Sequence, residues 1–162
     1  MERPKEAHWK AAKRILRYVK ETKRYGILYT TSENSELIGY IDSDWVGSID
    51  DRKITSGYVF HMGSGAISWA SKKQPIMALS TTELEYVAAT AATCQAVWMR
   101  RMLRSLCHEQ VKGTTIYCDN SSAISLSKNL VFHKRMKHID AKYHYIRELV
   151  SNGEIVLMHY RT

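Results

Sequence analysis

The order of the elements read from the sequence predicts an α/β domain built on a five-stranded mixed sheet. Three short strands separated by turns come first, and they predict an antiparallel meander. Helices then alternate with two further strands, which favours parallel pairing beside the meander and flanking helices. With 162 residues, of which 44% are hydrophobic, the chain is long enough for one domain with its own core.

Residues 1–30 form a basic segment that precedes the predicted sheet. They hold nine Lys or Arg and three Glu, a net charge of +6 out of +8 for the whole chain. A helix is predicted over residues 4–24, with Gly26 as its C-cap. Apolar residues recur along this helix at helical spacing, at Trp9, Ala12, Leu16 and Val19. The charge of this segment attracts polyanions, although a solvated helix face accounts for the same pattern.

The strands are predicted from runs of β-branched and aromatic residues bounded by turn residues. They span residues 37–45, 57–62, 66–71, 114–118 and 154–160. Helical spacing and cap residues predict the helices that lie between the later strands. These helices span residues 83–106, 120–126 and 137–150, and residues 80–82 supply the N-cap region of the first.

Three acidic residues stand at the ends of these elements. Asp42 lies in the first strand, Glu83 opens the first helix after the meander, and Asp119 follows the fourth strand. Ligands of α/β sheets bind at strand ends, and two Mg²⁺ ions on oxygen ligands can activate water and stabilise a leaving oxygen. Each residue alone is more typical of a turn or a helix cap. Together, the order and settings of the three predict a metal site for phosphodiester hydrolysis.

Two further carboxylates lie beside this set. Asp44 shares a strand face with Asp42, because side chains alternate along a strand, and it is an alternative metal ligand. Glu85 follows Glu83 at about 200° around a helix, so only one of them can face a single site. We assign Glu83 to the site because it lies in the first turn, where the helix dipole favours an anion.

Longer motifs around these residues resemble a known family. The motifs IGYIDSDWVG, DDRKITSGYVF, AISWASKKQP, ALSTTELEY, IYCDNSSAI and FHKRMKHIDAKYHYIRE cover residues 37–160 almost without a gap. In combination they resemble the ribonuclease H domain of copia-type LTR retrotransposon Pol polyproteins. Residues 4–29 resemble the segment that joins the reverse transcriptase to that domain. The resemblance thus divides the chain into a connection segment, residues 1–30, and a ribonuclease H-like domain, residues 37–160.

The resemblance implies an activity and a set of partners. It implies cleavage of the RNA strand of an RNA–DNA hybrid, with Asp42, Glu83 and Asp119 as catalytic carboxylates that hold two Mg²⁺ (or Mn²⁺) ions. The implied partners are the hybrid and the reverse transcriptase domain of the same polyprotein. The family also has a last helix with a fourth carboxylate beyond the fifth strand. The chain stops at Thr162 before such a motif, so we expect that helix to be absent and activity to be weakened or absent. Asp140 is the nearest candidate by position for a substitute ligand, although its setting is more typical of an aspartate on a helix surface.

Polar and basic residues near these motifs are candidates for binding the hybrid. They are Asn120, Ser80, Lys134, Arg135, Lys137 and His138. The basic members form a cluster that can contact a phosphate backbone. His159, in the last strand, is assigned a structural role.

Composition excludes several classes of protein. No run of about 18 apolar residues exists, so no membrane span is expected, and the polar N-terminus does not read as a secretory signal. The cysteines are scattered, at Cys94, Cys107 and Cys118. Such a set predicts reduced thiols in an intracellular, reducing compartment.

Other functions remain open beside the ribonuclease. A catalytically weakened or inactive nucleic-acid-binding remnant of the same domain also predicts hybrid binding, but no Mg²⁺-dependent cleavage. A pure protein-interaction module is disfavoured, because clustered carboxylates without a cation are costly. An integrase or resolvase fits less well with the glutamate that opens the helix.

Overall fold

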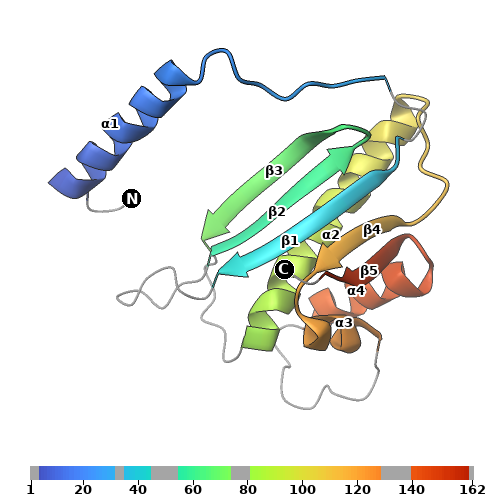
Figure 1. The fold of residues 1–162 in the computed structure, drawn as a ribbon. Coiled ribbons are helices and arrows are strands. Elements are labelled where there is room, and N and C mark those ends of the chain that lie inside the picture. Colours follow the sequence, from blue (N-terminus) through green and yellow to red (C-terminus); the bar gives the residue numbers. More distant parts are fainter. Residues whose placement is uncertain (1–3, 32–34, 45–54, 74–80, 129–139, 161–162) are drawn as a thin grey trace.

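The strands of the computed structural model form one sheet in the order β3-β2-β1-β4-β5 (Figure 1). The structure describes residues 4–31, 35–44, 55–73, 81–128 and 140–160. The strands are β1 (Leu37–Asp44), β2 (Thr55–Met62), β3 (Gly65–Lys73), β4 (Thr114–Cys118) and β5 (Ile155–His159). Neighbours among β1, β2 and β3 are antiparallel, whereas β4 pairs parallel with both β1 and β5. The predicted five-stranded mixed sheet is therefore confirmed.

Three helices cover one face of this sheet. They are α2 (Thr81–Ser105), α3 (Ser121–Lys128) and α4 (Asp140–Ser151), and they contact one another and the strands beneath them (Figure 1). The predicted start of α4 at residue 137 falls outside the described residues, which resume at residue 140. No helix in the described ranges is both long and apolar enough to cross a membrane.

The core lies between the sheet and α2. Alternate residues of the strands point toward the helices, and the side chains of Phe60, Tyr86 and Ile116 are fully buried. Gly39 makes the packing possible, because a Cβ added there would lie 2.7 Å from Cε1 of Phe60. The absence of a side chain on β1 at this point lets the Phe60 ring of β2 lie across the strand.

The first helix, α1 (Glu6–Glu21), ends earlier than the sequence predicts. Its C-cap is Thr22, and the predicted cap at Gly26 is wrong. The Thr22 backbone N–H donates to the Tyr18 carbonyl at 2.9 Å, and the Thr22 hydroxyl donates to the same oxygen at 2.8 Å. Thr22 thus donates twice to one carbonyl of the last turn, and the helix ends without a glycine.

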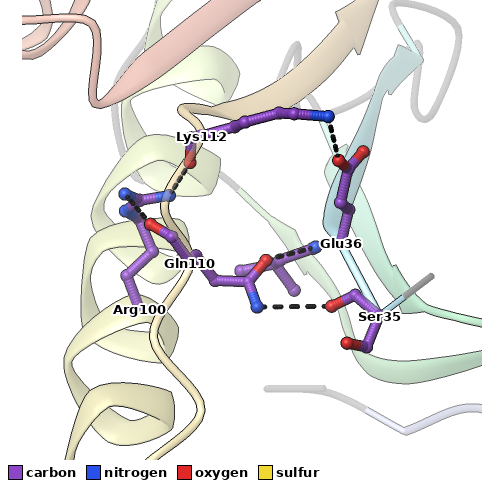
Figure 2. A network of polar contacts seen from close by, with 6 residues as sticks. Ser35, Glu36, Arg100, Gln110 and Lys112 are labelled. Atoms are coloured by element: carbon purple, nitrogen blue, oxygen red, sulfur yellow. Dashed lines mark hydrogen bonds and ion pairs between the residues drawn. The ribbon is translucent and has the colours of Figure 1, made fainter. Parts of the chain in front are cut away.

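A network of polar contacts holds the connection between α2 and β4 against the start of β1 (Figure 2). The Arg100 guanidinium donates to the carbonyls of Lys112 at 2.7 Å and Gln110 at 2.8 Å. The Gln110 side chain accepts from the Leu37 N–H at 2.9 Å and donates to the Ser35 carbonyl at 3.2 Å. These contacts align the beginnings of two parallel strands, so the ends of those strands are aligned as well.

Candidate metal and nucleic-acid site

Asp42 and Asp119 come together at the ends of β1 and β4. Tyr40 of β1 is paired with Tyr117 of β4 in a parallel register. Each aspartate follows its tyrosine by two residues, so the two carboxylates reach the same level of the sheet. Both line one cavity of about 230 Å³, which we call the aspartate cavity. Two of the three carboxylates assigned from the sequence therefore share a site.

Tyrosines form most of the remaining wall of the aspartate cavity. The rings of Tyr40 and Tyr117 stack with centroids 5.1 Å apart and planes inclined by 21°. The Tyr160 ring meets both of them edge-on, with centroids 6.2 and 6.1 Å away. None of these tyrosines is among the site residues predicted from the sequence. Strand alternation could have found Tyr40 and Tyr117, because each lies two positions before an aspartate and so shares its face.

Among the described side chains of α2, that of Glu85 lies close to Asp119. A carboxylate oxygen of Glu85, a carboxylate oxygen of Asp119 and the Cys118 Sγ atom all lie within 4.8 Å of one another. The Glu83 side chain lies outside the described part of α2, so its role stays a prediction. This proximity makes Glu85 a further candidate ligand, and the assignment of Glu83 from the helix dipole stays a prediction.

Cys118 lies between the two carboxylates as a neutral thiol. Burial raises the pKa of this thiol to about 11. The Asn120 N–H, 3.4 Å from the sulfur, lowers the pKa in part, whereas Glu85 and Asp119 raise it further because a thiolate beside them would add a third negative charge. Cys118 therefore occupies the space next to the carboxylates without competing with them as an anion at neutral pH.

The raised pKa of Cys118 predicts a difference in reactivity among the three cysteines. At pH 8, iodoacetamide should modify Cys94 and Cys107, which are exposed, and leave Cys118 unmodified in the folded protein. Only the thiolate reacts, and burial also blocks access. Mass spectrometry of peptides, with and without urea, measures this. Equal labelling rates for all three thiols in the folded state would contradict the assigned environment.

The same pKa shift predicts a loss of stability at high pH. The folded thiol titrates at about 11 and the unfolded thiol near 9.0. The unfolded chain therefore releases this proton first, so the stabilising contribution is complete below pH 9 and is lost as pH rises toward 11. Urea unfolding from pH 8 to 11 should show a shallower decline for Cys118→Ala than for the unmodified chain. An identical decline in stability for both proteins would mean that other titrating groups cause the loss.

His159 supports Asp119 from the neighbouring strand. Its Nε2 atom lies 3.0 Å from the Asp119 carbonyl oxygen, and the next residue, Tyr160, donates its N–H to the Cys118 carbonyl at 2.9 Å. These contacts fix the backbone at the end of β4, from which the side chain of Asp119 extends. The structural role predicted for His159 is therefore to hold the backbone at Asp119.

Replacing His159 should weaken metal binding more than it weakens folding. His159→Ala removes the donor to the Asp119 carbonyl, and loss of such an outer contact typically costs about 10-fold or more in metal affinity. Isothermal titration with Mn²⁺ measures the affinity, and urea unfolding measures stability. His159→Gln should restore part of the affinity because its amide N–H can donate. If both variants lose affinity only in proportion to stability, then the histidine does not position Asp119.

The other residues named from the sequence are placed only in part. Asp44 is the last residue of β1 and Asp140 the first of α4, but the structure describes neither side chain. Asn120 follows Asp119 and is half-buried. The remaining candidates lie outside the described residues: Ser80, Lys134, Arg135, Lys137 and His138. Their roles stay predictions.

Relatives in sequence cover the chain from end to end. It is 46% identical over 158 residues (98% of the chain) to the retrovirus-related Pol polyprotein from transposon TNT 1-94 of Nicotiana tabacum. It is 40% identical over 162 residues (100% of the chain) to that from transposon RE2 of Arabidopsis thaliana. The chain spans 11–12% of the length of these two polyproteins.

A shorter relative is the secreted RxLR effector protein 161 of Plasmopara viticola. It is 48% identical over 96 residues, which are 59% of this chain and 68% of the effector. No protein-family model matches the chain.

Solved structures with the same fold include a ribonuclease H and a viral polymerase. Ribonuclease H1 from Halobacterium salinarum matches 77% of this chain and 85% of its own, with a TM-score of 0.51 and 16% identity. The prototype foamy virus protease–reverse transcriptase matches 82% of this chain and 18% of its own, with a TM-score of 0.57 and 16% identity. At these identities the likeness concerns the fold alone. Sequence and fold together place the chain in the family of retrovirus-related Pol polyproteins of copia-type transposons, in which it represents a stretch with the ribonuclease H fold.

Proposed function

We propose that this chain is a metal-dependent endonuclease domain that cleaves the RNA strand of RNA–DNA hybrids during reverse transcription. The observation that carries the proposal is the parallel pairing of β1 with β4, which brings Asp42 and Asp119 to one cavity. Glu85 approaches Asp119 from α2, so the candidate ligands come from two strands and a helix. Carboxylates on separate rigid elements are suited to holding a cation beside a phosphate.

The donor set fits a hard divalent cation. Asp42, Glu85 and Asp119 offer carboxylate oxygens, which Mg²⁺ and Mn²⁺ accept. When bound, two such ions supply a nucleophilic water and stabilisation of the leaving oxygen.

The protein's own contribution is rigid placement of these groups. The β1–β4 register sets the level of Asp42 against Asp119, and His159 holds the backbone at the latter. Three tyrosine side chains line the aspartate cavity beside the two carboxylates, which are themselves exposed.

The proposed partners are an RNA–DNA hybrid and the reverse transcriptase domain of the same polyprotein. A net charge of +8 favours a polyanionic ligand, with binding that weakens as salt is added. The sequence relatives are Pol polyproteins, and a structural neighbour is a protease–reverse transcriptase. The intracellular, reducing location expected from the cysteines stays a prediction.

A cleavage assay on a labelled hybrid tests the proposal. The chain should cut the RNA strand with Mg²⁺ and not with EDTA, and Asp42→Asn or Asp119→Asn should abolish cutting. Glu109→Gln is a matched control, because this exposed glutamate pairs with Arg104 at the far end of α2. Cleavage that survives both aspartate substitutions would place the active site elsewhere.

A second candidate is a nucleic-acid-binding remnant without catalysis. It is favoured by the effector of Plasmopara viticola, in which 96 related residues make up 68% of the protein. Part of this sequence therefore occurs outside a polyprotein. A remnant should bind the hybrid in a salt-dependent manner by fluorescence anisotropy but show no Mg²⁺-dependent cutting.

A further inference from the structure

The apolar face of α1 is exposed along the whole helix. No residue of α1 is buried, and α1 stands apart from the sheet and its three helices (Figure 1). The side chains of Trp9, Leu16 and Val19 are 60%, 66% and 56% exposed. An amphipathic surface helix normally buries such a stripe against a core. Within the part of the chain that the structure describes, this face meets no core.

Cationic side chains flank that apolar face. The basic residues of α1 are Lys10, Lys13, Arg14, Arg17 and Lys20. The Lys13 ammonium lies 5.1 Å from the centroid of the Trp9 ring, so positive charge reaches the edge of the apolar stripe. Two copies of α1 packed face to face would bring like charges together. An apolar groove with an acidic rim is the complementary surface.

The segment that follows α1 is attached to the sheet at a defined point. The Tyr29 hydroxyl donates to the Ala66 carbonyl at 2.6 Å, and the Thr30 N–H donates to the Ser64 hydroxyl at 2.9 Å. Gly65 permits this contact, because an added Cβ would lie 2.7 Å from the Tyr29 ring. The turn between β2 and β3 therefore anchors the segment and presents α1 away from the sheet.

We propose that the apolar face of α1 (Trp9, Ile15, Leu16 and Val19) is the surface on which the polymerase part of the same Pol polyprotein docks. The inference rests on the proposed function. The tobacco relative matches 98% of the chain as 12% of one polypeptide, so a covalently linked partner is available. The fold of 99% of the chain also recurs within a foamy viral protease–reverse transcriptase, at a TM-score of 0.56 and 14% identity. A helix that accompanies the sheet inside a polymerase polypeptide can bury its apolar face there.

A binding experiment with one double variant tests the docking surface. The probe is the polymerase part of the tobacco TNT 1-94 polyprotein, expressed separately and titrated with the 162-residue chain by calorimetry. Leu16→Glu combined with Val19→Glu should weaken binding at least about 10-fold, because docking would bury two unpaired carboxylates in an apolar interface. Glutamate is a good helix former, so α1 itself should persist. Val111→Glu, at an apolar residue 94% exposed elsewhere, is the matched control and should bind as the unmodified chain does.

The outcomes separate this inference from the proposed function. No binding by the unmodified chain, or equal binding by the double variant, overturns the docking surface. A dimer of the chain that the double variant abolishes, seen by light scattering, would make a second copy the occupant and also overturn it. Hybrid cleavage is measured on the same samples. Docking without cleavage leaves the inference standing and counts against the ribonuclease, and cleavage without docking does the reverse.

Discussion

Glu85→Gln should reduce Mg²⁺-dependent cleavage of an RNA–DNA hybrid by at least about 100-fold, because outer contacts of a metal ligand alone are worth 10- to 100-fold. Glu83→Gln should leave cleavage largely intact. The reason is that a carboxylate oxygen of Glu85 lies within 4.8 Å of a carboxylate oxygen of Asp119, and that Glu85 is buried. The two substitutions change the same chemical group two residues apart, so each serves as the control for the other. Initial rates on a labelled hybrid, at saturating and limiting Mg²⁺, measure the effect.

The opposite pattern would support the assignment made from the helix dipole. If Glu83→Gln loses activity and Glu85→Gln keeps it, then Glu83 is the metal ligand and the buried glutamate is structural. Folding must be checked in both variants, because Glu85 is buried. Circular dichroism and urea unfolding make that check. Gln occupies nearly the same volume as Glu, so a disturbed fold should not account for the loss of activity.

Phe60→Ala should lower the free energy of unfolding by about 3–5 kcal/mol, the usual cost of emptying a fully buried aromatic site. Phe60 is 0% exposed, and it packs across Gly39 and against Tyr58, whose ring centroid lies 5.6 Å away. The surrounding strands are hydrogen-bonded on both sides of β2, so they cannot collapse into the space. Urea unfolding followed by fluorescence measures the change.

An exposed apolar residue supplies the control for that prediction. Leu106→Ala, just after the end of α2, should change stability by less than about 0.5 kcal/mol because Leu106 is exposed. Equal losses for the two variants would mean that Phe60 does not lie in the core. A small loss for Phe60→Ala alone would mean that the core between β2 and α2 relaxes more readily than its packing indicates.

The fold was largely predictable because its signals are local. The predicted strand over residues 114–118 coincides with β4, since turn residues bound an alternating apolar run there. The other strands and helices agree within a few residues at their ends. Where a predicted helix end differs from the structure, a side chain can be the cause. At the end of α1 the Thr22 hydroxyl caps the helix before the predicted Gly26. Such a cap depends on hydrogen bonds made by one residue, and their geometry is not visible in a hydrophobic pattern.

The candidate site was predictable where it depends on strand ends. Asp42 and Asp119 follow apolar strand residues, and parallel neighbours bring their ends to one edge of a sheet. The tyrosine wall was missed, although it follows from the same alternation. From the sequence, Cys118 was predicted only to be a reduced thiol. Its neighbour Glu85 belongs to α2, and its other neighbour, Asp119, directly follows β4.

By itself, the sequence determined the order of the elements, the mixed sheet, the family and the two aspartates at neighbouring strand ends. Only the tertiary structure decided that Glu85 lies close to Asp119, what surrounds the Cys118 thiol, and that α1 keeps its apolar face exposed. The physical reason lies in the start of α2, where every residue from Glu85 to Thr90 is buried. A helical segment that is buried all round has no exposed stripe to reveal its rotation about the helix axis. That rotation is set by packing against β1, β2 and β4, which no local pattern encodes.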